Sequence, residues 1–210
     1  MKHFVFLLGR PGCGKSVVYK IIKDALEKKG ISAPRVDDFL TLQAIFDRDT
    51  EFKRHIRKDG GFAVTDWTVV DEALQDLNAH VKKEKTDNKM IFIEFARDNY
   101  KHAFENFTKD VLDDSVILYL YSTFEECYNR NVARFQKAQK EGHDDHIVPL
   151  ELMKTYYRTD DYEQAYLKSE EELMKMVPAK TIVLDSTVSG EAGIVNLRKQ
   201  IEKGVLNELF

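Results

Sequence analysis

The chain has 210 residues, a length that suits a single domain with a sizeable core, spanning residues 1–210. Its 32 basic and 36 acidic residues leave a net charge of −4, so no overall positive field favours long nucleic acid as a partner. Its two cysteines stand far apart, which argues against a disulfide framework, and no apolar run approaches the ~20 residues that span a bilayer. We therefore expect a soluble, cytoplasmic protein without a membrane partner, whose oligomeric state the composition leaves open.

The first expected element is a buried strand over Phe4–Leu8, because every residue in this run is apolar. It leads directly into Gly9-Arg-Pro-Gly-Cys-Gly-Lys-Ser16, and an amphipathic helix is expected over Lys15–Lys29. A strand, a glycine-rich loop ending in Gly-Lys-Ser and a helix form the arrangement that a phosphate-binding loop (P-loop) requires. The sequence therefore predicts a site for a nucleoside triphosphate.

The residue types of this loop suit a phosphate chain. Glycines let the backbone approach phosphate oxygens closely, and the N–H groups of the loop and of the helix N-terminus favour negative charge. The lysine of such a loop reaches the β- and γ-phosphates, and the hydroxyl that follows it holds Mg²⁺; Lys15 and Ser16 match these roles. The residues expected to bind the nucleotide are Gly9, Pro11, Gly12, Cys13, Gly14, Lys15, Ser16 and Val17.

An acidic pair follows the second expected strand, Ala33–Val36, and precedes a helix expected over Leu40–Ile56. Asp37 and Asp38 therefore stand at the carboxyl end of a strand, where open α/β sheets bind their ligands. One of them can accept a proton from an acceptor hydroxyl, or hold hydroxyl groups of the acceptor. Asp is also a favoured helix N-cap, so a structural role suits the pair equally well.

The third expected strand, Met90–Phe95, follows a helix expected over Trp67–Lys85 and carries a carboxylate near its end. Glu94 can orient Mg²⁺ or its water, since a P-loop needs a nearby acid for its metal, or it can be an exposed strand-end acid. Arg97 can clamp an acceptor phosphate with two hydrogen bonds, or it can pair with a carboxylate, either Glu94 or Asp98. Both interpretations stay open for each side chain.

Two arginines mark the helix expected over Phe124–Glu141, which follows the fourth strand, Val116–Tyr121. Arg130 and Arg134 stand four residues apart and so share one face of this helix. They can embrace a transferring phosphoryl group, or they can form a solvated surface, because the apolar stripe lies on the opposite side. The polar segment over residues 141–148 is typical of a lid that closes over the phosphates.

The rest of the chain continues the alternation of strands and helices. Helices are expected over Lys101–Leu112, Leu150–Met176 and Gly190–Leu206, and a fifth strand over Thr181–Leu184. Apolar strands separated by helices indicate a parallel sheet with right-handed crossovers. We predict a three-layer α/β fold, with a five-stranded parallel sheet and helices on both of its faces.

Together these features resemble the P-loop kinases of the nucleoside monophosphate kinase type, a family of P-loop NTPases with adenylate and thymidylate kinases as familiar members. The resemblance implies the strand order 2-3-1-4-5, an acceptor-binding insertion over residues 37–85 and a lid region over residues 130–158. It also implies ATP as the nucleotide, with the adenine held near Asp185–Ser189.

The same resemblance implies roles for individual side chains. Glu94 and Arg97 fall where the family has a strand-end acid and an acceptor-binding arginine. Arg130 and Arg134 match its lid arginines. These assignments favour phosphoryl transfer over the other uses of a P-loop.

The sequence also departs from adenylate kinase. Glu94-Phe-Ala-Arg97 replaces the pattern Asp-Gly-phenylalanine-proline-arginine that follows the third strand there. Val36-Asp-Asp-Phe39 instead resembles polynucleotide kinases and related hydroxyl kinases, in which an aspartate after the second strand is the general base. The arginine that those enzymes carry after the acidic pair is missing, since Leu40 and Thr41 follow. A hydroxyl acceptor and a phosphate acceptor therefore both stay open.

We expect a kinase that moves the γ-phosphoryl group of ATP, with Mg²⁺, to a small acceptor such as a nucleotide, a nucleoside or another hydroxyl compound. Catalysis would fall to Lys15, Asp37, Arg130 and Arg134, with Asp37 as base only for a neutral hydroxyl. The acceptor would contact Asp37, Asp38 and Arg97, and the metal would contact Ser16 and Glu94.

Two other classes use similar parts. A nucleotide-operated regulatory ATPase, or switch, would hydrolyse ATP without any acceptor. A nucleic-acid-end or toxin-like kinase would turn its basic lid towards a polymer, a use that the net charge of −4 disfavours.

Overall fold

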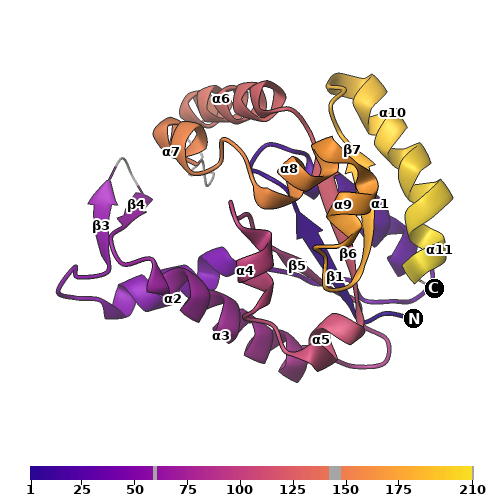
Figure 1. Cartoon of the computed structure of the whole chain (residues 1–210), viewed down its shortest axis with the longest axis horizontal. Helices are drawn as coiled ribbons and strands as arrows, with labels where there is room; N and C mark the ends of the chain where they lie inside the picture. Colours follow the sequence, from indigo (N-terminus) through magenta and orange to yellow (C-terminus); the bar gives the residue numbers. More distant parts are fainter. Residues whose placement is uncertain (59–60, 142–147, 210) are drawn as a thin grey trace.

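Five parallel strands form the central sheet of the computed structural model, which describes residues 1–58, 61–141 and 148–209 (Figure 1). The sheet order is β2-β5-β1-β6-β7, and every neighbouring pair is parallel. Helices cover both faces, so the predicted three-layer α/β architecture is confirmed. The strands are β1 (Phe4–Leu8), β2 (Arg35–Asp37), β5 (Ile91–Glu94), β6 (Ser115–Tyr121) and β7 (Lys180–Asp185).

Counted among the five strands of the main sheet alone, the spatial order is 2-3-1-4-5, but numbered along the whole chain it is 2-5-1-6-7, because the described residues form seven strands and the expectation allowed for five. The two additional strands, β3 (His55–Lys58) and β4 (Gly61–Val64), pair with each other in an antiparallel hairpin apart from the main sheet. They come between the second and third strands of the main sheet along the chain, and therefore shift every later number.

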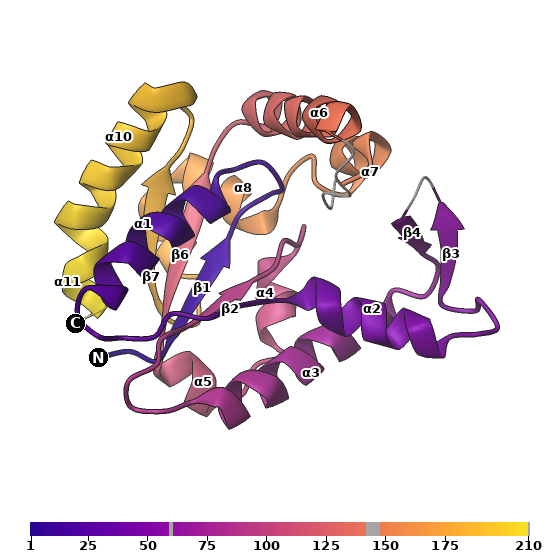
Figure 2. The ribbon, with the colours of Figure 1, turned by 180° about the vertical axis from the view of Figure 1, so that it is seen from behind.

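The strands alternate their side chains between two cores, which explains why they read as continuous apolar runs. Val5 and Leu7 point to one face of β1, and Phe4, Phe6 and Leu8 to the other. All of these side chains are buried. The first face is covered by α1 (Lys15–Glu27), α10 (Gly190–Gln200), the π-helical turn η1 (Ile201–Val205) and α11 (Leu206–Leu209), which Figure 2 shows in front of the sheet.

Shorter helices than expected cover the second face. Within the helix expected over Leu150–Met176, two capping side chains each begin a new helix. Asp160 accepts a hydrogen bond from the Glu163 N–H and begins a new helix, and Ser169 does the same for Glu172. The helix expected over 101–112 is also divided: α4 ends at Phe104 and α5 begins at Lys109, here without a side-chain cap hydrogen bond from Thr108. The helices on this face are α3 (Thr68–Glu84), α4 (Tyr100–Phe104), α5 (Lys109–Asp113), α8 (Asp161–Lys168) and α9 (Glu170–Met174).

The segment over residues 38–67, which we call the arm, contains α2 (Asp38–Arg48) and the β3-β4 hairpin, and it extends away from the sheet in Figure 1. The helix expected over Leu40–Ile56 ends at Arg48 because the Asp49 carboxylate accepts hydrogen bonds from the N–H groups of Lys53 and Arg54. This side chain folds the backbone into a turn that leads into β3. The periodicity of the sequence does not reveal it.

Above the carboxyl edge of the sheet, α6 (Phe124–Glu141) lies beside α7 (Leu150–Thr155) in both ribbon views (Figures 1 and 2). The bounds of α6 match the prediction, and Thr123 caps it by accepting a hydrogen bond from the Glu126 N–H. Most of the expected lid segment, residues 142–147, lies outside the described residues. In the described part of the chain, no helix has the length and apolar character needed to cross a membrane.

Candidate functional site

The glycine-rich loop connects β1 to α1 as expected, and its shape depends on glycine at two close approaches. Gly9 and Gly12 adopt φ values of 125° and 85°, which residues with a Cβ rarely adopt. A Cβ on Gly9 would lie 2.6 Å from the carbonyl oxygen of Leu120, and one on Gly12 would lie 2.4 Å from that of Cys127. The loop can therefore pack against β6 and α6 only with glycine at these positions.

Lys15 is buried at the start of α1, with its charge turned back into the loop. Its ammonium group donates hydrogen bonds to the carbonyl oxygens of Gly9 at 2.6 Å and Arg10 at 3.2 Å. It also lies 3.9 Å from Oε1 of Glu94. A full positive charge therefore stands where the loop curves, which suits binding of phosphate oxygens.

Ser16 and Glu94 both face the same point beside this lysine. The Ser16 hydroxyl lies 3.1 Å from Nη1 of Arg35, and Oε2 of Glu94 lies 3.4 Å from the same nitrogen. Oε2 is buried and, apart from this ion pair with Arg35, accepts no hydrogen bond from the described residues. A hydroxyl and a carboxylate are oxygen ligands of the kind that Mg²⁺ prefers, usually together with phosphate oxygens. These residues fit a magnesium ion.

Arg10 anchors the P-loop to α8 through a buried ion pair, a contact that was not predicted from the sequence. Its guanidinium is buried and forms a bidentate ion pair with the Glu163 carboxylate, in which Nη1 lies 3.0 Å from Oε1. Nη1 also donates to the carbonyl oxygen of Ser122, and the other nitrogens donate to those of Tyr157 and Arg158. Arg10 occupies a position that the P-loop pattern leaves free, so no sequence motif marks it.

Only one of the two expected lid arginines lies beside the P-loop. Arg130 donates hydrogen bonds to the Ser186 carbonyl oxygen at 2.8 Å and to the Ser189 hydroxyl at 2.9 Å, and its Nη1 lies 3.4 Å from the Gly12 carbonyl oxygen. It therefore links the P-loop to the loop after β7, where the resemblance suggests the adenine. Arg134 lies one turn further along α6, where it is exposed and has no hydrogen-bond or ion-pair partner among the described residues.

The acidic pair at the junction of β2 and α2 is engaged in structural contacts. Asp37 is the N-cap of α2 and accepts a hydrogen bond from the Phe39 N–H at 3.2 Å. Asp38 forms an ion pair with Arg97, with 2.5 Å between Oδ2 and Nη2. Of the partners expected for Arg97, the structure therefore shows neither Glu94 nor Asp98. The Nε atom of Arg97 is buried without a hydrogen-bond partner in the described part of the chain.

Arg97 also lines a cavity of about 370 Å³ between the end of the arm, the start of α3, the loop after β5, α4 and the residue that follows α7. One wall is aromatic, because Trp67 stacks on Tyr156 with 5.0 Å between ring centroids and 21° between planes. Another wall carries His102, whose pKa is raised by hydrogen bonds to Asp71 and then to Glu105. The cavity thus combines a flat aromatic surface with a buried guanidinium, and it draws on both of the regions expected to bind the acceptor and form the lid.

Three solved structures of similar fold match nearly the whole chain, whereas no family model and no curated protein matches the sequence. The APS kinase CysC of Mycobacterium tuberculosis, in complex with AMPPNP and APS, is 14% identical and has a TM-score of 0.55. The match covers 96% of this chain and 98% of that chain.

Kti12 of Chaetomium thermophilum, in complex with ADP-AlF3, is 15% identical over 96% of this chain and 98% of that chain, with a TM-score of 0.52. APE1195 is 16% identical over 97% of this chain and 96% of that chain, with a TM-score of 0.50. At such low identity the likeness shows the fold alone. The chain therefore has the α/β fold of the P-loop kinases.

Proposed function

We propose that this protein is a phosphotransferase that moves the γ-phosphoryl group of ATP, with Mg²⁺, to a small acceptor. The observation that carries the proposal is the placement of two sites along one edge of the sheet. The P-loop follows β1, and the cavity lined by Arg97 lies beyond the end of the neighbouring strand β5. Ligands of open α/β sheets bind at this carboxyl edge, and adjacent sites there let a donor and an acceptor meet.

The comparisons support this class of function. The matched APS kinase was solved with AMPPNP and APS, and the matched Kti12 with ADP-AlF3. If this chain uses its fold in the same manner, a nucleotide would bind at Lys15 and a second small molecule at the cavity with Arg97. The nucleoside monophosphate kinase type is one form that such an enzyme could take.

Phosphoryl transfer asks a protein mainly for positioning and charge stabilisation. Lys15 and the loop N–H groups would hold the β- and γ-phosphates, and Ser16 and Glu94 would hold Mg²⁺, which neutralises developing negative charge. Arg130 would add positive charge from α6. Arg134, which is exposed, would contribute only after a movement of α6.

On the acceptor side, the free Nε–H of Arg97 suits an anionic group, and the Trp67–Tyr156 wall suits a flat one. For a neutral hydroxyl acceptor, Asp37 would be the general base. Its Oδ1 accepts the capping hydrogen bond, so the proton would pass to the other oxygen. A phosphate acceptor would need no base.

The test is transfer of labelled γ-phosphate from ATP, with Mg²⁺, to a panel of nucleoside monophosphates, nucleosides, sugars and 5′-hydroxyl oligonucleotides. We expect a labelled small acceptor with the wild type and a loss of roughly 10²-fold or more with Lys15→Ala, because a charge aimed at the transition state is removed. Lys20→Ala is the matched control, since Lys20 is an exposed lysine of the same helix. It should keep full activity.

Two outcomes would replace the proposal. Lys15-dependent phosphate release without any labelled acceptor would indicate a regulatory ATPase or switch. Label appearing only on the oligonucleotides, with binding that weakens steeply as salt rises, would indicate a nucleic-acid-end kinase.

A further inference from the structure

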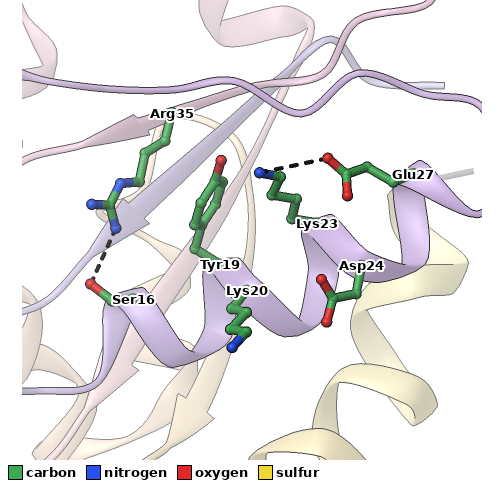
Figure 3. A pocket seen from close by; sticks show the side chains of 7 residues that line it. All are labelled: Ser16, Tyr19, Lys20, Lys23, Asp24, Glu27 and Arg35. Atoms are coloured by element: carbon green, nitrogen blue, oxygen red, sulfur yellow. Dashed lines mark hydrogen bonds and ion pairs between the residues drawn. The ribbon is translucent and has the colours of Figure 1, made fainter.

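Arg35, the first residue of β2, places a positive charge between the two groups that fit the metal. Its Nη1 atom lies 3.1 Å from the Ser16 hydroxyl and 3.4 Å from Oε2 of Glu94. Figure 3 shows the guanidinium reaching across from β2 to the first turn of α1. Arg35 belongs to no motif, and nothing in its sequence neighbourhood indicates that it reaches the P-loop.

Several contacts hold Arg35 in this position. Its guanidinium lies over the ring of Tyr19, 5.0 Å from the ring centroid, in a cation–π contact. Register pairing with Phe92 fixes the backbone of Arg35 two residues before the partner of Glu94, so both side chains stand on the α1 face of the sheet. The arginine is therefore part of a built arrangement around Glu94.

Glu94 lies between two cations, Lys15 and Arg35, which contact different oxygens of its carboxylate. Lys15 lies 3.9 Å from Oε1 and belongs to the nucleotide loop, whereas Arg35 lies beside Oε2 and the Ser16 hydroxyl. A magnesium ion needs its oxygen ligands at about 2.0–2.1 Å. A guanidinium nitrogen that shares the same two oxygens would lie close to that ion, and two positive charges at such a distance repel each other.

The protein leaves space for the arginine to withdraw. Arg35, Tyr19 and Ser16 line a cavity of about 420 Å³ that runs along α1. The Arg35 side chain is 32% exposed, so a change of rotamer would carry its charge towards water rather than into the core.

We propose that Arg35 is an internal competitor of the metal, which must leave Ser16 and Glu94 before Mg²⁺ can bind there with the nucleotide. This inference rests on the metal site of the proposed function. Arg35 neutralises Glu94 in the metal-free protein and lowers the affinity for the metal–nucleotide complex, because its ion pair with Glu94 has to be broken first. Arg35 thereby sets the concentration of Mg²⁺ at which the site fills.

The test measures binding of AMPPNP by isothermal titration calorimetry in excess MgCl₂. Arg35→Met keeps an apolar stem against Tyr19 and removes the charge. We expect it to bind Mg·AMPPNP roughly two- to fivefold more tightly than the wild type, the range that corresponds to loss of a partly exposed ion pair. Arg35→Lys, which keeps a cation, should stay close to the wild type.

Lys20→Met is the matched control. Lys20 lines the same cavity, but Figure 3 shows it on the other side of α1 from Arg35. Its affinity for Mg·AMPPNP should equal that of the wild type. Thermal melting of each variant checks the fold, and Arg35→Gln replaces Arg35→Met if the latter does not fold.

Equal or weaker binding of Mg·AMPPNP by Arg35→Met would overturn the inference, and weaker binding would make Arg35 a phosphate ligand instead. Absence of Mg·AMPPNP binding by the wild type would overturn the inference together with the nucleotide site. Normal binding without any labelled acceptor in the transfer assay would overturn the proposed phosphotransferase alone, so the two failures are distinguishable.

Discussion

Asp160 is a buried carboxyl group that titrates near neutral pH. It lies at the N-terminus of α8, where it accepts a hydrogen bond from the Glu163 N–H at 2.8 Å and one from the Tyr119 hydroxyl at 3.0 Å. Burial raises the pKa of Asp160 to about 7, although the hydrogen bond from the Glu163 N–H and the nearby charge of Arg10 act in the opposite direction. The cost of holding this charge inside the protein should therefore appear in the pH dependence of stability.

We predict that Asp160→Asn flattens this pH dependence. Between the ordinary pKa of 3.8 and the folded pKa of about 7, the folded protein holds a proton that the unfolded chain has released, so the wild type loses stability as pH rises through this window. An amide oxygen can still accept both hydrogen bonds but carries no charge. At about 1.4 kcal/mol per pKa unit, the free energy of unfolding lost by the wild type is at most about 4 kcal/mol.

Urea unfolding at pH 5, 6, 7 and 8 measures this effect. Asp110→Asn is the control, because the pKa of Asp110 is lowered to about 2, mainly by its hydrogen bonds to Thr108 and Lys82, and so lies outside this range. The control should keep the slope of the wild type. A slope for Asp160→Asn equal to that of the wild type would contradict the prediction.

At the scale of elements, α8 and α4 support the P-loop from the second face of the sheet. Asp161 accepts hydrogen bonds from the N–H groups of Tyr100 at 2.7 Å and Lys101 at 2.9 Å, which joins the two helices. The Tyr100 hydroxyl then accepts a hydrogen bond from the Gly9 N–H at 2.9 Å. Glu163 on α8 holds Arg10, so the loop is tied to this pair of helices at two consecutive residues.

We predict that Glu163→Gln destabilises the protein by roughly 3–5 kcal/mol, because it leaves the buried Arg10 guanidinium without its counter-ion. Glu172→Gln on the neighbouring α9 is the control. It removes a carboxylate from an exposed pair with Lys175, so little or no change is expected.

Chemical denaturation of the three proteins at one pH measures the difference. If Glu163→Gln were as stable as Glu172→Gln, the ion pair of Arg10 would not be what holds α8 against the P-loop. A normal denaturant slope in both variants would show that the loss of stability is not caused by a changed unfolded state.

At the scale of the whole molecule, one aromatic contact joins the arm to the end of α7 beside the Arg97 cavity. Trp67, at the end of the arm, stacks on Tyr156, which directly follows α7, although 88 residues lie between them in the chain. Trp67 is the single tryptophan of the sequence and is 50% exposed. Its fluorescence therefore reports whether the arm and α7 meet in solution.

We predict that Tyr156→Ala moves the tryptophan emission to longer wavelength, because the Trp67 ring loses its stacked neighbour and gains water. The variant should also lose about 0.5–1.5 kcal/mol of stability beyond the loss of burial, the value of an aromatic pair. Steady-state emission spectra of the folded proteins measure the shift.

Tyr166→Ala is the matched control, since Tyr166 contacts the ring of Tyr121, tilted at 56° to it, on a different part of the molecule. Its emission should match that of the wild type. Identical spectra for Tyr156→Ala and the wild type would show that the arm and α7 do not meet as described.

The elements of the fold were predictable where the signal is local and strong. Phe4–Leu8 and the bounds of α6 were predicted correctly, because a continuous apolar run and a long amphipathic period leave few alternatives. The β3-β4 hairpin was missed, and so were the breaks before α8 and α9. Each depends on a single polar side chain that accepts hydrogen bonds from backbone N–H groups, as Asp49 does. A polar residue at such a position hardly alters the hydrophobic pattern of the sequence.

By itself, the sequence determined the P-loop, the buried strands and therefore the class of fold, because these depend on residues that are neighbours in the chain. Only the tertiary structure decided what the charged side chains do. Arg10 meets Glu163 across 153 positions, Arg97 meets Asp38 across 59, and Arg35 meets Ser16 across 19. A charged residue can pair with any opposite charge within reach, and the packing of strands and helices selects which one is near.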